Sequence, residues 1–454
     1  SSLPALLERA MARHQAGDLA MAARLYREIL QREPRHFEAL HQLGVARAQA
    51  GNTTEAARHL TAAIAVNPGS AEAHLCLAHV RMAAGETQAA LDNYEQALDL
   101  KPEYPEAWYG RGNALLALAR HAEAVESYDR ALALAPDRPE ALTHRGNALH
   151  DLKRFDEALA DYDRALALLP DVAMLHNNRG NTLRVLQRHA EALASLDRAL
   201  ALEPGYLDAR ANRGNVLQDL RRHAEALAEF DRALALNPRV SALHSLRAGV
   251  LHDLNRHADA VASYQRALEL DPANPETMYH YAVVLCDLAR FNDALVSLDR
   301  ALALKPDDVK AIHNRILCLC ALRRHEEAAV AVARLLELAP DWDYAQGQLF
   351  DSRAHCCDWA AYAARAHELV QAVTEGRKAA YPFAFLAVTA SAAAQRVCAQ
   401  THAADKYPAS VTPLWTGVPY SHDRIRVAYV SADFREHPVS YLMTGVFERH
   451  DRRR

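Results

Sequence analysis

Seven asparagines recur at fixed places along the chain and offer side-chain amides to a ligand. They are Asn113, Asn147, Asn181 and Asn215 at one position of a 34-residue cycle, and Asn178, Asn212 and Asn314 at a second position three residues earlier. Because a carboxamide both donates and accepts hydrogen bonds, a row of such groups could hold the main chain of an extended polypeptide and remain indifferent to its sequence. The alternative is that these asparagines only meet water or bond to the adjoining repeat. The pattern alone leaves both interpretations open.

Histidine also recurs with the same spacing, at a point where a turn is expected. It occurs as His121, His189, His223, His257 and His325, while Phe155 and Phe291 fill the equivalent place. Residues on successive repeats cannot converge on one ion, and phenylalanine replaces histidine in some units, so we expect these rings to pack in the turns. The run His355, Cys356 and Cys357 suggests metal ligands, but neighbouring residues of a helix point in different directions, and we expect buried, reduced thiols instead. No metal site is predicted.

The elements that must position these residues follow from a strict period. Prolines stand 34 residues apart, at Pro34, Pro68, Pro102, Pro136, Pro170, Pro204, Pro238, Pro272, Pro306 and Pro340. An alanine precedes each proline by twelve residues, and a Gly or Ala precedes that alanine by a further twelve, with Ile316 as the one exception. Small residues allow two helices to pack closely, and proline ends the second helix because its ring lacks an N–H and clashes with the preceding turn. The cycle therefore predicts a helical hairpin, repeated ten times.

These residues are similar to the tetratricopeptide repeat, which has the same 34-residue period and the same order of small and aromatic positions. The resemblance covers residues 3–342, three quarters of the chain. It implies an all-α fold, a right-handed superhelix of ten helical hairpins whose first helices line a concave groove. The implied partners are proteins or peptides held in that groove, because such arrays are mostly binding scaffolds.

Beyond Pro340 the period stops, and we expect residues 343–422 to form a helical bridge and a connector. Helical stretches are predicted at about residues 344–356, 359–375 and 383–401. A short β-branched run follows at residues 425–430. That run predicts the first strand of an α/β domain at residues 423–454, followed by a polar loop of the kind that binds ligands in open sheets.

The same segment carries a second resemblance. The sequence DRIRVAYVSADF at residues 423–434, followed by HP at 437–438 and YLM at 441–443, looks like the opening of the catalytic region of the O-linked N-acetylglucosamine transferase family, in its bacterial SPINDLY-like branch. HCCDW at residues 355–359 and PFAFL at 382–386 fit the same branch. The resemblance implies a glycosyltransferase with two Rossmann lobes. Such an enzyme moves N-acetylglucosamine from its uridine diphosphate donor (UDP-N-acetylglucosamine) to serine or threonine of bound proteins, with no metal and no further cofactor.

The resemblance assigns the catalytic role to His437, whose imidazole could accept a hydroxyl proton. A purely structural role, capping the turn before Pro438, is the alternative. Only 24 residues follow Val430, too few for two nucleotide-binding lobes. We therefore expect a truncated start of the catalytic domain that is inactive by itself, in a piece of a longer gene product.

Two alternatives to a transferase remain. One is a non-catalytic scaffold that assembles proteins through the groove. The other is a receptor for acidic peptides with a clamp of recurring arginines, unless these pair with acids of neighbouring repeats. The arginines are Arg111, Arg145, Arg179, Arg213, Arg247 and Arg315.

Composition narrows the class of protein further. The chain has 454 residues, 50% of them hydrophobic, and a formal charge of −5. With 52 basic and 57 acidic residues it provides no basic field for nucleic acid. Its seven cysteines, an odd number, fit a reducing compartment. No apolar run reaches the roughly 18 residues that span a bilayer. We expect a soluble cytoplasmic protein with neither a membrane nor a nucleic-acid partner.

Overall fold

The computed structural model describes residues 2–408, in which every regular element is a helix. These residues belong to two compact units that divide between Arg323 and Arg324. The predicted strand at residues 425–430 and the predicted catalytic His437 lie outside the described residues, so the α/β segment stays a prediction. None of the helices in the described part of the chain combines the length and the apolarity that a membrane span requires.

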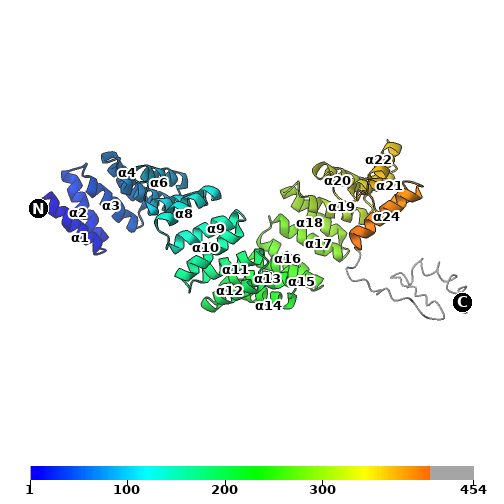
Figure 1. Ribbon diagram of the computed structural model, residues 1–454, viewed down its shortest axis with the longest axis horizontal. Helices are drawn as coiled ribbons and strands as arrows, with labels where there is room; N and C mark the ends of the chain where they lie inside the picture. Colours follow the sequence, from blue (N-terminus) through cyan, green and yellow to red (C-terminus); the bar gives the residue numbers. More distant parts are fainter. Residues whose placement is uncertain (1, 409–454) are drawn as a thin grey trace, which may run out of the picture. The chain divides into compact units, whose positions relative to one another are not determined.

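The first unit is a series of helices that follow one another as pairs (Figure 1). Successive first helices begin 34 residues apart, as the sequence predicts. The first helices are α1 Leu3–Gln15, α3 Phe37–Gln49, α5 Ala71–Ala83, α7 Pro105–Ala117, α9 Pro139–Asp151, α11 Ala173–Val185, α13 Leu207–Asp219, α15 Ser241–Asp253, α17 Pro275–Asp287 and α19 Val309–Ala321. The second helices are α2 Leu19–Arg32, α4 Thr53–Val66, α6 Thr87–Leu100, α8 His121–Leu134, α10 Phe155–Leu168, α12 His189–Leu202, α14 His223–Leu236, α16 His257–Leu270 and α18 Phe291–Leu304.

A residue in the left-handed conformation ends the first helix of each pair. Between α1 and α2 this residue is Gly17, with φ of 79°, and the amide of Asp18 donates to the carbonyl of Arg13 at 3.0 Å. That bond closes a glycine cap of the Schellman type. Later units place other residues at the same point, including Ala119 and Arg221, both with φ of 56°. The left-handed conformation costs such residues roughly 1–2 kcal/mol, so the packing of the two helices overrides a local preference.

The small residue of each first helix lies against a large side chain of the second helix. A Cβ added to Gly112 would lie 2.5 Å from Cε1 of Tyr128, and one added to Gly146 would lie 2.7 Å from Cε1 of Tyr162. Both rings are buried. The recurring alanine of the second helix, such as Ala124 between these positions, is fully buried as well. The close helix packing predicted from the small residues is therefore confirmed.

Neighbouring pairs of the first unit pack mainly by the second helix of one pair against the first helix of the next, and their first helices also contact each other. Helix α3 contacts α5, α5 contacts α7, α7 contacts α9, and α9 contacts α11. Within the described residues of this unit, no two second helices approach each other to the same extent. Because the closer-spaced helices of a curved stack lie on its inner side, the first helices line the concave face. The all-helical solenoid is thus confirmed, while its right-handed sense stays a prediction.

The recurring arginines join each pair to the preceding one. Arg179 donates to Asp163 of α10 at 2.6 Å, and all six arginines make the equivalent ion pair with an acid of the preceding second helix. Arg145 additionally binds the buried Asp161 at 2.6 Å. The proposed clamp for acidic peptides is therefore wrong, because its arginines are already neutralised within the array. Salt bridging between repeats, the alternative, is confirmed.

The second unit begins with α20 His325–Leu338 and continues with α21 Ala345–His355, α22 Tyr362–Thr374, α23 Pro382–Phe385 and α24 Ala392–Lys406. Its core contains Leu369, Phe385 and Cys398. The single helix predicted at residues 383–401 is wrong, since α23 stops after one turn and a new helix starts beyond Ser391. The Ser391 hydroxyl accepts a hydrogen bond from the amide of Ala394 at 3.3 Å, which caps α24 and favours a separate start.

The run from His355 to Cys357 lies where α21 ends. The ring of His355 stacks on that of His325, with 4.3 Å between their centroids. Both thiols are free, as expected, but Cys356 is only half-buried and Cys357 is exposed. The prediction of buried thiols is therefore wrong. Cys357 has φ of 55° because it occupies the left-handed turn position after the helix, which lies at the surface.

Candidate functional site

The asparagines of the predicted ladder lie half-buried on the first helices of the first unit. On α7, the Oδ1 atom of Asn113 accepts a hydrogen bond from the Tyr128 hydroxyl at 2.7 Å and lies 2.8 Å from Nδ1 of His144 on the next first helix. Its amide nitrogen makes no hydrogen bond within the described residues. The carbonyl oxygen thus serves the fold, and the amide N–H groups remain available to a ligand.

The next pair repeats this arrangement with a second asparagine in place of histidine. Oδ1 of Asn147 accepts from the Tyr162 hydroxyl at 2.8 Å and from Nδ2 of Asn178 at 3.1 Å. The Nδ2 atom of Asn147, like that of Asn113, makes no hydrogen bond within the described part of the chain. Bonding to the adjoining repeat, which was the alternative to ligand binding, is therefore confirmed for the carbonyl oxygens. Ligand binding by the amide nitrogens stays a prediction.

The other ladder asparagines are less regular. Nδ2 of Asn212 donates to Asn177 at 2.9 Å, Nδ2 of Asn181 lies 3.5 Å from Nε2 of His150, and Asn314 donates to the Tyr279 hydroxyl at 3.3 Å. Asn215 lies half-buried on α13. The hydrogen bonds that link ladder side chains of neighbouring first helices are thus most regular across α7, α9 and α11.

A second row of bonds, which the sequence analysis missed, runs along the carboxyl ends of the first helices. Arg184 donates to Asp219 at 3.1 Å, and Gln218 donates to Asp253 at 2.8 Å. His252 continues the row with Nε2 lying 2.6 Å from Oδ2 of Asp287. The signal was present in the sequence, because Asp151, Asp219, Asp253 and Asp287 recur at the last position of their helices.

Acidic residues also recur at the start of the first helices. They are Glu38, Glu72, Glu106, Glu140, Asp208 and Glu276, each the second residue of its helix. An acid in the first turn is favoured by the helix dipole, so each one supports its own helix. Together with the aspartates at the other ends, they place recurring carboxylates along both ends of the first helices, which the sequence analysis did not predict.

The histidines at the start of the second helices behave as turn residues. Nδ1 of His121 lies 3.5 Å from Asp151, and Nδ1 of His223 lies 3.6 Å from Asp253, in each case an aspartate of the next first helix. This agrees with the predicted packing role. At His257 the arrangement gains a third member, since ligand atoms of His252, His257 and Asp287 lie within 4.8 Å of one another. The bond between His252 and Asp287 accounts for that proximity without an ion.

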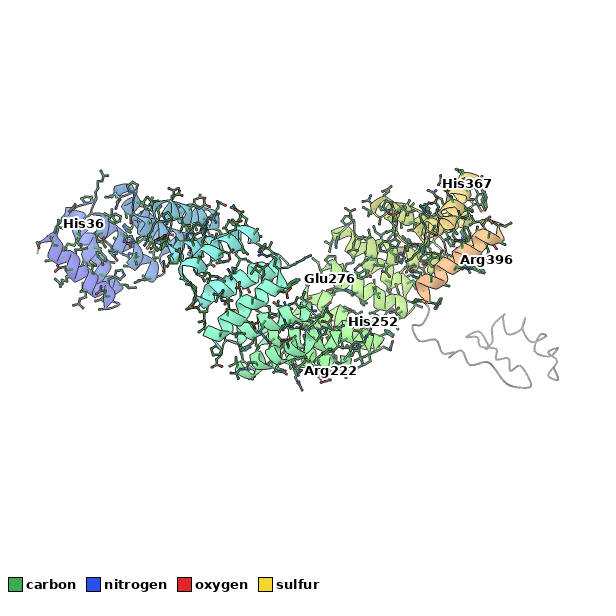
Figure 2. The ribbon with its side chains drawn as sticks, viewed as in Figure 1. His36, Arg222, His252, Glu276, His367 and Arg396 are labelled. Carbon is green, nitrogen blue, oxygen red and sulfur yellow. The ribbon has the colours of Figure 1, made fainter. Side chains whose placement is uncertain are left out.

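The row formed by Asn113, Asn147, Asn181 and Asn215 ends on α13, and Gly249 holds the same repeat position on α15. A cavity of about 460 Å³ opens there between α13, α15 and α17. Its lining includes Gln218, His252, Tyr264 and Glu276. Figure 2 labels His252 on α15 and Glu276 at the start of α17. Polar and charged groups therefore surround a hollow on the concave face.

Comparison with known proteins agrees with the repeat architecture. Family models described as tetratricopeptide repeat match residues 13–80, 75–139, 139–172, 173–206, 211–275 and 251–316. Among curated proteins, no sequence matches the chain.

Several solved structures are similar to parts of the chain. MamA is 27% identical over 36% of this chain and 94% of its own, with a TM-score of 0.35. YrrB, described as a TPR protein with an unusual peptide-binding site, is 26% identical over 40% of this chain and 94% of its own, with a TM-score of 0.37. A tetratricopeptide repeat protein from Parabacteroides merdae is 20% identical over 55% of this chain and 98% of its own, with a TM-score of 0.41. The matched repeat stretches span well over half of the sequence, and the chain belongs to the tetratricopeptide-repeat family.

Proposed function

We propose that the repeat array is a protein-interaction scaffold that binds client proteins as extended polypeptides along its first helices. The observation that supports this most directly is the state of Asn113 and Asn147. Their carbonyl oxygens are held by tyrosine hydroxyls at 2.7 and 2.8 Å, which fixes the side chains, while their amide nitrogens make no bond within the described residues. Fixed donors on a concave face suit the main-chain carbonyls of a client, and they require no particular client sequence.

The test uses the full chain and uncharged peptides, so that only main-chain recognition is measured. Peptides free of Asp, Glu, Lys and Arg are selected by display, labelled, and titrated by fluorescence anisotropy. In the double variant Asn113→Asp, Asn147→Asp, each tyrosine hydroxyl keeps an oxygen acceptor but both amide donors are lost. We expect binding to weaken by about tenfold or more, in line with the loss of two hydrogen bonds.

The control is Asn255→Asp, which makes the same type of substitution once, in the turn between α15 and α16. We expect it to bind like the parent chain. If no uncharged peptide binds, or if the double variant and the control bind alike, main-chain recognition by the ladder is refuted. Circular dichroism of each variant establishes that the helices remain formed.

A second candidate function rests on the segment at residues 423–443, and on nothing in the described part of the chain. We propose, from its resemblance to the O-linked N-acetylglucosamine transferase family, that the array delivers clients to a glycosyltransferase in which His437 is catalytic. The product of the complete reading frame, incubated with labelled UDP-N-acetylglucosamine and a serine-rich acceptor, is expected to transfer the sugar. His437→Ala is expected to abolish transfer. Absence of transfer, or transfer unaffected by this substitution, would remove the candidate.

A further inference from the structure

Gly249, which follows Asn215 at the same repeat position, leaves space that no other group of the described residues fills. A Cβ added to Gly249 would lie 3.7 Å from the Tyr264 hydroxyl and 3.9 Å from Nε2 of Gln218, which are ordinary contact distances. At Gly112 and Gly146, by contrast, an added Cβ would overlap a tyrosine ring. Close helix packing therefore explains Gly112 and Gly146 but not Gly249. What Gly249 provides is the cavity of about 460 Å³ beside it.

The hydroxyl of Tyr264 reaches this cavity without a partner. In the two regular units the equivalent tyrosines, Tyr128 and Tyr162, each donate to a ladder asparagine. Tyr264 is equally buried, with 4% of its surface exposed, and it lines the cavity, yet its hydroxyl makes no hydrogen bond within the described residues. The hydroxyl oxygen is accessible from the cavity, so a ligand that enters from the groove can form a hydrogen bond with it.

The charges around the cavity select the kind of ligand. Glu276 and Asp253 line it, and neither arginine nor lysine does. Asp253 accepts a hydrogen bond from the neutral amide of Gln218 and lies 3.6 Å from Nδ1 of His223, and Glu276 makes no ion pair within the described residues. His252 is bound to Asp287, and burial lowers the pKa of His280, the other histidine of the lining. Asp253 and Glu276 thus line opposite ends of the hollow, and no arginine or lysine of the described residues lines it.

We propose that this cavity binds one basic side chain, arginine or lysine, of a client polypeptide lying in the groove. The aliphatic part of such a side chain packs on Leu246 and Gly249, and its cationic end takes the carboxylate of Asp253 as partner, while Glu276 adds negative potential from the other end of the cavity. The Tyr264 hydroxyl then accepts a hydrogen bond from the same cation. The volume is ample for a side chain of this size and leaves room for water. This assignment rests on the proposed function, because the client's main chain must lie on the first helices.

The first experiment examines the cavity without a client. Nα-acetyl-L-arginine methylamide is titrated into the full chain and followed by NMR, with the citrulline analogue as a neutral probe of equal shape. We expect saturable binding of the arginine probe and at least about tenfold weaker binding of the citrulline probe. Gly249→Asn places a side chain in the cavity and supplies the missing partner of Tyr264, and we expect it to weaken binding at least about tenfold while the helices stay formed.

The matched pair Glu276→Gln and Glu140→Gln separates the cavity from the general acidity of the groove. Both residues hold the second position of a first helix, but only Glu276 lines the cavity. We expect the Glu276 variant to weaken binding of the arginine probe about threefold or more, and the Glu140 variant to leave it unchanged. Equal effects of the two substitutions, or unaltered binding in Gly249→Asn, would overturn the proposal.

The second experiment joins the cavity to the groove. An uncharged peptide that binds the chain is rewritten with one arginine at each position in turn, and we expect a gain in affinity at one position that Gly249→Asn removes. No gain at any position overturns the proposal, even where uncharged peptides bind. Failure of all uncharged peptides, with the arginine probe still bound, instead refutes the proposed main-chain recognition and leaves the cavity as a site for a basic group.

Discussion

The glycines of the first helices provide a direct measure of how closely the paired helices pack. In Gly112→Ala, the new methyl group would lie 2.5 Å from Cε1 and 2.8 Å from Cζ of Tyr128, so the ring or the helix must move. Overpacking of this kind costs roughly 1–3 kcal/mol. In Gly249→Ala, the nearest atom is the Tyr264 hydroxyl at 3.7 Å, and nothing has to move. Both substitutions gain the same helix propensity of about 1 kcal/mol.

Because the propensity gain cancels, the difference between the two variants isolates packing and is expected to be about 1–3 kcal/mol, with Gly249→Ala the more stable. Repeat arrays unfold in parts, so a single melting temperature is not sufficient. Amide hydrogen exchange of α7 and α8 in one variant, and of α15 and α16 in the other, gives the free energy of local opening directly. Equal shifts in the two variants would refute the argument that glycine is required for close approach at Gly112.

Three further predictions follow from single residues. Arg145→Ala leaves the carboxylate of Asp161 buried and unpaired, and we expect amide hydrogen exchange of α9 and α10 to show a loss of about 3 kcal/mol in the free energy of local opening; a loss below about 1 kcal/mol would contradict this. Ala119 has a left-handed φ of 56°, and we expect Ala119→Gly to raise the free energy of unfolding by about 0.5–1 kcal/mol. Gly85→Ala, at φ of 78°, is expected to lower it by a similar amount. A change of the same sign in both variants would refute the role of backbone strain. Burial lowers the pKa of His144 below 6.5, so the imidazole binds a proton more readily in the unfolded chain than in the folded one, and the free energy of unfolding falls as the pH drops below about 6.5. We expect His144→Asn to make this fall shallower between pH 7.5 and 5. An unchanged slope would contradict the prediction.

The helices of the repeats could be predicted because each is marked by several independent signals. Pro136 ends α8, and Gly112 and Ala124 mark the contact between α7 and α8, so an error in one signal is corrected by the others. The second unit has no such redundancy. The break before α24 depends on one capping hydroxyl, that of Ser391, within a stretch rich in alanine. A pattern search gives such a residue little weight, although its bond decides where the helix starts.

The candidate site was only partly predictable, because a sequence displays side chains and not the space between them. Asn113 and Asn147 were found from their spacing, but the tyrosine hydroxyls that hold their carbonyl oxygens come from the second helices, 15 residues later. The bond between Gln218 and Asp253 joins residues 35 apart, one more than the period, and is evident only when adjacent helices are placed side by side. Gly249 was the most difficult to interpret, because its proposed role depends on the side chain that it lacks.

An interrupted ladder has a consequence that a uniform one lacks. Where every unit offers the same donors, an extended polypeptide can bind in several registers, shifted by whole units, with equal energy. Such an array gains affinity from its length but cannot determine which client residue lies over which helix. The α15 unit differs from the units of α7 to α13 in having Gly249 in place of an asparagine, so a register that places a basic residue beside Asp253 and Tyr264 is favoured over the others. The glycine on α15 would then set the register of the client, while Asn113 and Asn147 contribute affinity without regard to sequence. In an array of similar repeats, the unit whose side chains differ from the others thus determines which register of the client is favoured.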